Sequence, residues 1–248
     1  MYAGSKALFH ALSRSAALKR FASRYGLATS DTFASRFIAG ETVEAAIDVS
    51  RRLESQGLLV TLDHLGERVR TVDESTDATV EYVRLIDVIV RAGVERNISL
   101  KLTQLGIDVD RATCVDNLRR ILEPATRHGF FIRIDMENSP YTARTIEIFE
   151  TLWHYEYRNV GVALQASLHR TESDLRRMNA LGARVRLVKG AYKEPSSAAN
   201  QHKADVDRAF VRFGHLLLEA GTYPAIATHD PDLIEEIRAY AEVQGIAK

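Results

Sequence analysis

The chain has 248 residues, 46% of them hydrophobic, and its 33 Lys and Arg residues balance its 33 Asp and Glu residues. This length and apolar content allow one large domain or two small ones with a sizeable core. The balanced charge argues neither for nor against a charged partner. Cys114 is the single cysteine, which excludes an intrachain disulfide and suits a reducing compartment.

The first thirty residues are basic and contain no acid before Asp31. Residues 5–24 predict a helix, and residues 42–56 predict a second one, so we expect an N-terminal helical segment over residues 1–56. Such a start fits a transit peptide or a membrane-surface helix, but we favour a solvated amphipathic helix that packs on the body. No apolar run approaches the roughly twenty residues of a membrane-spanning helix.

Six short apolar segments follow, each separated from the next by an amphipathic helical stretch. Strands that alternate with helices indicate parallel βα units. A glycine falls between helix and strand five times, where a left-handed cap belongs: Gly57, Gly93, Gly129, Gly182 and Gly221. The expected strands are Leu58–Asp63, Asn97–Leu102, Phe130–Met136, Asn159–Ala166, Arg184–Lys189 and Tyr223–Thr228.

The strand spacing and the end of the chain predict the architecture. Strand starts recur every 25–40 residues or so, roughly the interval of a TIM-type barrel. Gly245 stands in a cap position, and Ile246-Ala247 resembles the start of a seventh strand. We therefore predict that residues 57–248 form a (β/α)8 barrel domain with strands 1–6 and their helices, and without the last two βα units.

Polar side chains gather at the carboxyl ends of these expected strands, where barrel enzymes hold their ligands. Lys101 and Asp135 end neighbouring strands and could pair, either as a structural ion pair or as part of a site. Gln165 is equally open to a structural or a functional interpretation. Lys189-Gly190 predicts a cradle for an anion. The full set is Asp63-His64, Lys101, Asp135-Met136-Glu137, Gln165, Arg186, Lys189 and Thr228-His229-Asp230.

Several common sites have no matching pattern in the sequence. The histidines form no His-x-His or His-Glu-x-x-His motif, so a zinc site is not indicated. Asp135 and Glu137 would point to opposite faces of a strand, which argues against a shared metal. No Gly-x-Gly-x-x-Gly follows a strand, no Gly-x-Ser-x-Gly elbow occurs, and nothing resembles a nucleic-acid module.

Taken together, the motifs at the strand ends resemble the proline dehydrogenase family, specifically its short monofunctional bacterial members. The resemblance begins near Arg36 and extends to Asp230. It is carried by Arg36–Thr42, Leu62–Glu67, Ser99–Leu102, Ile132–Glu137, Val162–Ala166, Arg186–Tyr192 and Ala225–Asp230. The family also carries a Tyr and two adjacent Args on its last helix, and no stretch of this sequence fits that motif.

The resemblance implies a barrel that binds FAD at its mouth and oxidises L-proline to Δ1-pyrroline-5-carboxylate, passing electrons to a membrane quinone. It implies catalytic roles for Lys101, Asp135 and Arg186. Lys101 and Asp135, with Ala191 and Tyr192, would form the proline pocket, where we expect Asp135 to orient Lys101. The cofactor residues implied are Met136, Gln165, Arg186, Val188, Lys189, Gly190, Thr228 and His229.

Two other functions stay open at this stage. A barrel lyase of the class I aldolase type would use Lys101 or Lys189 as a Schiff-base nucleophile, and an incomplete barrel could function only as a non-catalytic fragment. The resemblance implies a cytoplasmic location, with peripheral attachment to the inner face of the bacterial membrane as an option. The oligomeric state is not predicted.

Overall fold

The structure, a computed structural model, describes residues 39–40, 42–64, 66 and 69–246. The chain divides into two compact units, Met1–Leu59 and Val60–Lys248. In the first unit, helix α3 (Val43–Glu54) lies within the second helix expected from the sequence, and the Thr42 hydroxyl caps it by accepting from the Ala45 N–H. The helix expected over residues 5–24 lies outside the described residues.

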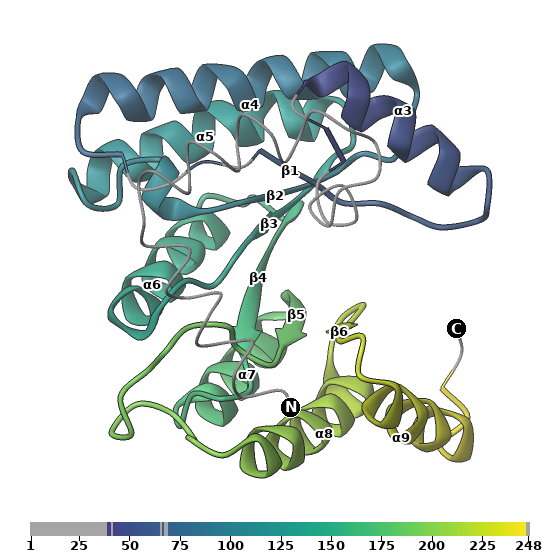
Figure 1. The fold of residues 1–248 in the computed structure, drawn as a ribbon. Helices are drawn as coiled ribbons and strands as arrows, with labels where there is room; N and C mark the ends of the chain where they lie inside the picture. Colours follow the sequence, from purple (N-terminus) through teal and green to yellow (C-terminus); the bar gives the residue numbers. More distant parts are fainter. Residues whose placement is uncertain (1–38, 41, 65, 67–68, 247–248) are drawn as a thin grey trace, which may run out of the picture. The chain divides into compact units, whose positions relative to one another are not determined.

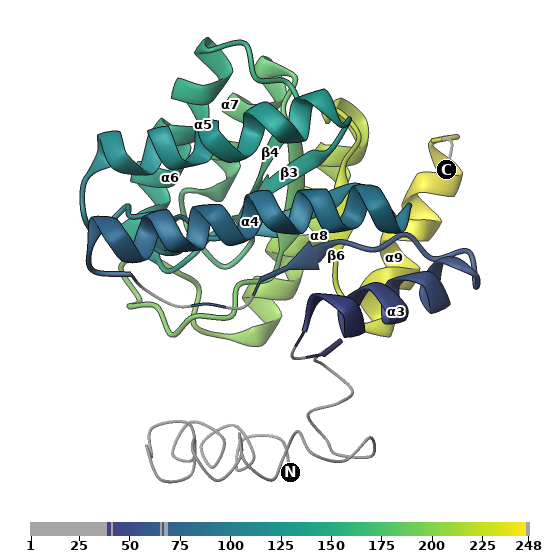
Figure 2. The ribbon, with the colours of Figure 1, turned by 90° about the horizontal axis from the view of Figure 1, so that it is seen from above.

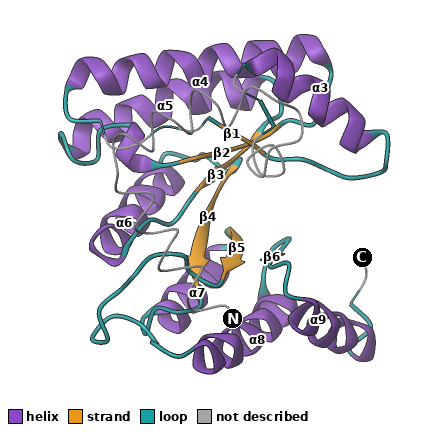
Figure 3. Ribbon diagram, in the orientation of Figure 1, coloured by secondary structure: helices purple, strands orange, loops and turns teal. Residues whose placement is uncertain are grey.

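The second unit is built on a parallel sheet whose six strands lie in sequence order (Figure 1). All six expected strands are confirmed, and the helices between them make the fold α/β. Figure 3 shows the strands as one curved series, a half-barrel. The strands are β1 (Leu62–Asp63), β2 (Asn97–Leu100), β3 (Phe131–Ile134), β4 (Val160–Gln165), β5 (Arg184–Val188) and β6 (Ala225–Ala227).

The helices of this unit pack along one face of the sheet, where α5 and α6 contact β3 and β4 and α8 contacts β5. Figure 2 shows α5, α6 and α7 beside β3 and β4. Between sheet and helices lies an apolar core that includes the fully buried Ile98, Ile132 and Val162. The helices are α4 (Val72–Ala92), α5 (Arg111–Arg127), α6 (Ser139–His154), α7 (Thr171–Leu181), α8 (Lys203–Ala220) and α9 (Pro231–Val243), with a 3-10 turn η2 (Leu102–Gln104).

The opposite face of the sheet, which we call the inner face, carries the polar side chains. Along β5 the burial alternates, because Val185 and Leu187 are fully buried in the core while Arg184 and Arg186 lie on the inner face and are half-buried. Strand register aligns inner-face residues in rows across neighbouring strands. The inner face therefore brings charged groups from several strands close together.

The observed elements correct the expected boundaries in places. β2 stops at Leu100 because η2 begins at Leu102, and Lys101 is the residue between them. Four of the five expected glycine caps have positive φ, but the expectation for Gly221 is wrong, since its φ of −84° is extended. In that connection Tyr223 takes the left-handed conformation, with φ 46°. The seventh strand expected at residues 246–247 falls partly outside the described residues.

Candidate active site

Two strand-end carboxylates bind two cations at the inner face, and we call Asp63, Lys101, Asp135 and Arg186 the Lys101 cluster. The Lys101 Nζ lies 2.7 Å from Asp63 Oδ2 and 3.9 Å from Asp135 Oδ2. The Arg186 Nη1 donates to Asp135 Oδ1 at 3.1 Å. The pairing of Lys101 with Asp135 is thus confirmed, although each of the two has a closer partner.

Lys101 is held in its cationic form. Burial acts to lower its pKa, but the hydrogen bond that Lys101 donates to Asp63 and the charges of Asp63 and Asp135 outweigh burial and raise it. Tyr192 acts in the same direction and so lies within electrostatic range of Lys101. A lysine must be neutral to attack a carbonyl carbon, so this environment does not favour Schiff-base chemistry at Lys101.

Asp135 has a pKa raised from its usual value. Burial is the main cause, and it outweighs the opposing charges of Arg186 and Lys101. Its side chain remains 23% exposed, so it faces the site rather than the core. A carboxylate with a raised pKa holds a proton more readily than an ordinary one, and the orienting role expected for Asp135 stays a prediction.

Gln165 ends β4 and is buried, at 2% exposure. Its Nε2 donates to the carbonyl of Glu137 at 2.7 Å. The Glu137 carboxylate accepts from the N–H and the hydroxyl of Thr103, at 3.1 and 2.6 Å. These bonds join the ends of β2, β3 and β4, and they hold the Gln165 amide in one orientation. Met136, between Asp135 and Glu137, is also buried.

Gly190 follows β5 with φ 106°, a conformation that side chains rarely adopt. A Cβ at this position would overlap the Ser167 hydroxyl and lie 3.2 Å from Gln165 Oε1. The backbone here therefore passes close to the end of β4, and only glycine fits. Val188, the residue that ends β5, pairs in register with Gln165.

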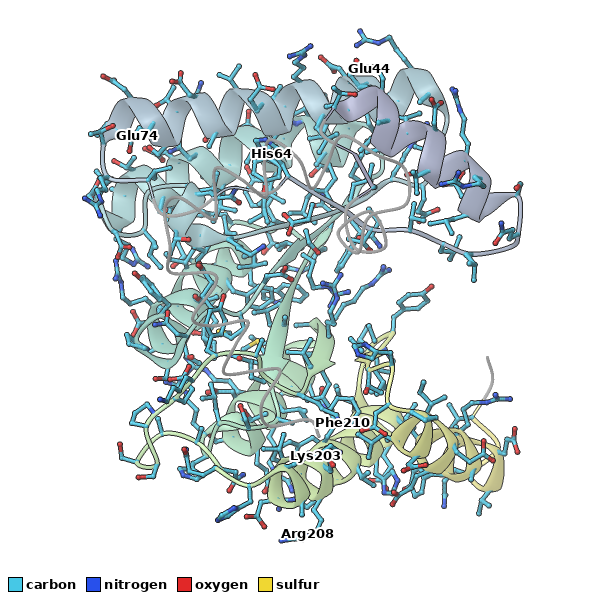
Figure 4. The ribbon with its side chains drawn as sticks, in the orientation of Figure 1. Glu44, His64, Glu74, Lys203, Arg208 and Phe210 are labelled. Atoms are coloured by element: carbon cyan, nitrogen blue, oxygen red, sulfur yellow. The ribbon has the colours of Figure 1, made fainter. Side chains whose placement is uncertain are left out.

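Lys189 lies between two carboxylates, because its Nζ is 2.8 Å from both Asp207 Oδ1 and Asp230 Oδ2. Lys203, the first residue of α8 (labelled in Figure 4), binds the same two aspartates. We call these four residues the Lys189 network. The pKa of Asp230 is lowered to about 2, mainly by the hydrogen bonds from Lys189 and Lys203.

The remaining expected site residues have fewer contacts. The Thr228 hydroxyl accepts from the Asp230 N–H at 3.1 Å, so it shapes the turn after β6. His229, Ala191 and Tyr192 are exposed. Of these three, Tyr192 contributes to the raised pKa of Lys101.

Four residues of the two charge groups were given no role in the sequence analysis: Asp63, Asp207, Asp230 and Lys203. Asp63 was noted at a strand end but given no role, yet it is the nearest partner of Lys101. Asp207 lies on α8, far along the chain from Lys189, and the only sequence signal was its position four residues after Lys203, the spacing of a helical ion pair.

The described residues include no group of three or more His, Cys, Asp or Glu side chains placed to hold a metal ion. Within the same residues, no helix has the length and apolar character needed to cross a membrane.

A parallel α/β half-barrel with ionisable groups at the carboxyl ends of its strands defines this chain as a barrel-type enzyme. The sequence model for proline dehydrogenase matches residues 46–248. The chain belongs to the proline dehydrogenase family, whose members are oxidoreductases.

Individual relatives agree with the family match. The chain is 37% identical to proline dehydrogenase 2 of Bacillus subtilis strain 168 over 236 residues, which cover 95% of this chain and 77% of that protein. It is 36% identical to the proline dehydrogenase of Deinococcus radiodurans, over 87% of this chain and 71% of the relative. The chain thus spans about three quarters of the length of these relatives.

Solved structures support the fold. The proline utilization A (PutA) protein of Bdellovibrio bacteriovorus, inactivated by N-propargylglycine, superposes with a TM-score of 0.79 at 24% identity. The match covers 87% of this chain and 27% of the PutA chain, so this chain spans about a quarter of that protein. A likeness at this identity shows a shared fold for the matched region.

Proposed function

We propose that this protein oxidises L-proline to Δ1-pyrroline-5-carboxylate with FAD, as the first step of proline degradation. The observation that carries the proposal is the Lys101 cluster, found at the strand ends of a chain that belongs to the proline dehydrogenase family. We also propose that residues 57–248 form a barrel domain of the (β/α)8 type, preceded by a helical segment over residues 1–56.

The residues present fit a flavin nucleotide. Gly190 has no side chain and a φ of 106°, and backbone in such a conformation suits a phosphate or ribityl chain; the Ser167 hydroxyl occupies the space that a Cβ would take. Arg186, which pairs in register with Ala163 of β4, supplies a guanidinium on the inner face. The Lys189 charge is balanced by two aspartates, so Lys189 would contribute a hydrogen bond more than net charge. The full set proposed to hold FAD is Met136, Gln165, Arg186, Val188, Lys189, Gly190, Thr228 and His229.

In this mechanism the flavin would supply the hydride acceptor, and the protein would supply orientation and charge. Lys101 and Asp135 would bind proline, with Ala191 and Tyr192 as part of the pocket wall. Asp63 holds the Lys101 ammonium in place at 2.7 Å. Arg186 holds Asp135 at 3.1 Å, so the carboxylate would be positioned to orient Lys101 and to take a proton from the substrate ammonium.

The electron acceptor and the location complete the proposal. We propose a quinone as acceptor, and a cytoplasmic protein that attaches peripherally to the inner face of the bacterial membrane. Binding to quinone-containing liposomes tests the attachment. A signal that is unchanged after deletion of residues 1–30 would remove the basic N-terminus from this role.

The decisive experiment is the visible absorbance spectrum of the purified chain, followed by anaerobic addition of L-proline. A two-banded flavin spectrum that bleaches with L-proline, and that bleaches far more slowly in Lys101→Met, is the expected result. A yellow protein that does not bleach would show that the flavin is bound, and it would contradict the proposed proline site. A colourless, well-folded protein would overturn the flavin proposal for this chain.

A further inference from the structure

Asp63 lies on a strand that offers few backbone hydrogen bonds. β1 has two residues, which pair in register with Ile98 and Ser99 of β2, whereas β4 has six residues. Asp63 is nevertheless the nearest partner of Lys101, with 2.7 Å between Oδ2 and Nζ. An ion pair at a functional site needs both side chains held in place by their surroundings, so contacts outside the strand ladder are needed to support this one.

Tyr82 on α4 supplies such a contact through Gln104 of η2. Both side chains are buried, at 0% and 2% exposure. The Tyr82 hydroxyl lies 2.9 Å from Gln104 Oε1, 3.3 Å from the His64 carbonyl oxygen and 3.5 Å from Asp63 Oδ1. Burial, followed by the charges of Asp63 and Asp135, raises the pKa of Tyr82, so the hydroxyl stays protonated. A hydroxyl donates one proton, and the shortest contact identifies Gln104 as its acceptor.

Gln104 links both members of the ion pair. Because its Oε1 accepts from Tyr82, its Nε2 is free to donate to the His64 carbonyl, which it does at 2.9 Å, immediately after Asp63. Its backbone N–H donates to the Lys101 carbonyl at 3.2 Å. One glutamine, oriented by the Tyr82 hydroxyl, therefore connects the end of β1 to the residue that precedes η2.

The rings and the backbone around this contact are closely packed. The Tyr82 ring meets the ring of His64 (labelled in Figure 4) edge to face, with 5.8 Å between the ring centroids. The Gly66 backbone passes so close to Gln104 that a Cβ there would overlap the amide nitrogen. These contacts favour the single arrangement in which the Tyr82 hydroxyl points at Gln104.

We propose that Tyr82 is a positioning residue of the active site, whose hydroxyl acts through Gln104 to hold Asp63 and Lys101 at ion-pair distance. The proposal rests on the proposed function, which assigns Lys101 to proline binding. The alternative is that the hydroxyl only satisfies a buried glutamine, as buried polar groups require. The two interpretations differ in one consequence, because removal of the hydroxyl changes the ionisation of Lys101 only if the hydroxyl positions the pair.

The first test measures Lys101 itself and needs no proline oxidation. Acetic anhydride acylates only the neutral form of a lysine, so its reaction with Lys101 is followed by mass spectrometry between about pH 8 and about pH 12. Asp63 raises the pKa of Lys101, as do Asp135 and Tyr192. In Tyr82→Phe the Asp63 contact should weaken, so the pH midpoint should fall and labelling at about pH 9 should be roughly threefold faster or more.

Tyr240→Phe is the matched control, because it removes a tyrosine hydroxyl that donates to Glu219, between α9 and α8. Its Lys101 labelling should equal that of the unmodified protein. Gln104→Met removes the same link from the other side and should lower the midpoint as Tyr82→Phe does, so it serves if Tyr82→Phe does not fold. An unchanged midpoint in the folded variants, even with faster labelling at every pH, would overturn the proposal.

The second test is a double-mutant cycle on kcat/KM for L-proline. Tyr82→Phe should lower kcat/KM by roughly threefold to tenfold, and Tyr240→Phe should leave it unchanged. If the hydroxyl acts through Asp63, Tyr82→Phe should cost little more in a protein that already carries Asp63→Asn, and fully additive losses would overturn the proposal. An unmodified protein that does not oxidise proline would contradict the proposed function, and the Lys101 labelling would still decide whether Tyr82 positions the pair.

Discussion

At the scale of single residues, the candidate site depends on pairings between strand ends. Lys101 is the example, because its closest partner is Asp63 on the adjacent β1, at 2.7 Å, and not the Asp135 expected from the sequence. Residue types at strand ends predicted which side chains gather. The distances between them depend on strand stagger and rotamers, which no local pattern encodes.

The Asp63→Asn variant tests the role of this pairing in proline oxidation. Asparagine keeps the shape but removes the charge that holds the Lys101 ammonium, so we expect kcat/KM for L-proline to fall about tenfold or more. Steady-state kinetics with an artificial electron acceptor measures it. Asp116→Asn, which removes an exposed partner of Arg119, should leave kcat/KM unchanged, and an equal loss in both variants would contradict the assignment.

The same pair predicts a dependence on alkaline pH. The pKa of Lys101 is raised above its ordinary value of 10.5, so its contribution to stability is fully present below that pH and is lost as pH rises through the higher folded-state value. Urea unfolding should therefore show a stability difference between the unmodified protein and Asp63→Asn that is constant near neutrality. That difference should shrink above about pH 10.5, and a difference that grows there would contradict the pairing.

Gly190 gives a prediction based on sterics. Gly190→Ala would adopt an unfavourable φ of 106° and would also overlap the Ser167 hydroxyl, so we expect a loss of about 1–3 kcal/mol in the free energy of unfolding. Gly93→Ala is the control, because Gly93 also has positive φ but nothing within 4 Å of the added Cβ. Urea denaturation compares the two. Adding Ser167→Ala should recover stability in the Gly190 variant only.

At the scale of elements, the sequence predicted the order of strands and helices well. The apolar segments of period two and the glycine caps depend on local chemistry, and four caps took the positive φ expected of them. The errors in element boundaries and cap conformation occur where tertiary contacts determine the backbone conformation. β2 is cut short by η2 at Leu102, and Gly221 is extended, with its N–H bonded to the Leu217 carbonyl at 2.8 Å.

The connection between β5 and α8 provides a prediction at this scale. Glu194 in that connection is 8% exposed, and its carboxylate accepts from the N–H of Ser139 at 2.7 Å and from the Ser139 hydroxyl. Ser139 begins α6, where an anion is favoured by the helix dipole. Glu194→Gln should lower the free energy of unfolding by about 1–2 kcal/mol and increase hydrogen exchange in residues 190–200.

The control for this variant is Glu81→Gln, which removes an exposed partner of Arg84 at 3.7 Å. Exposed pairs of this kind contribute about 0–1 kcal/mol. If Glu194→Gln is no more destabilising than Glu81→Gln in urea, or if exchange in residues 190–200 is unchanged, then Glu194 does not fix this connection to α6.

At the scale of the whole molecule, two charge groups titrate at opposite ends of the pH range. The Lys101 cluster responds to alkali, through the raised pKa of Lys101. The Lys189 network responds to acid, because hydrogen bonds from Lys189 and Lys203 lower the pKa of Asp230 from 3.8 to about 2. Stability arising from Lys101 and Asp230 should thus be flat over the neutral range and fall at both extremes.

The Asp230→Asn variant tests whether the loss of stability at acid pH arises from the Lys189 network. A carboxyl group whose folded pKa is depressed contributes stability that is present above its ordinary value of 3.8 and is lost as pH falls toward about 2. Asp230→Asn should therefore be less stable than the unmodified protein at neutral pH, and the two should converge in that acid window. Asp205→Asn removes only an exposed partner of Arg208, so its free energy of unfolding should fall at acid pH as much as that of the unmodified protein. Urea unfolding followed by circular dichroism between pH 2 and pH 7 measures all three proteins, and a difference that persists to pH 2 would show that Asp230 acts through its hydrogen bonds and not through its charge.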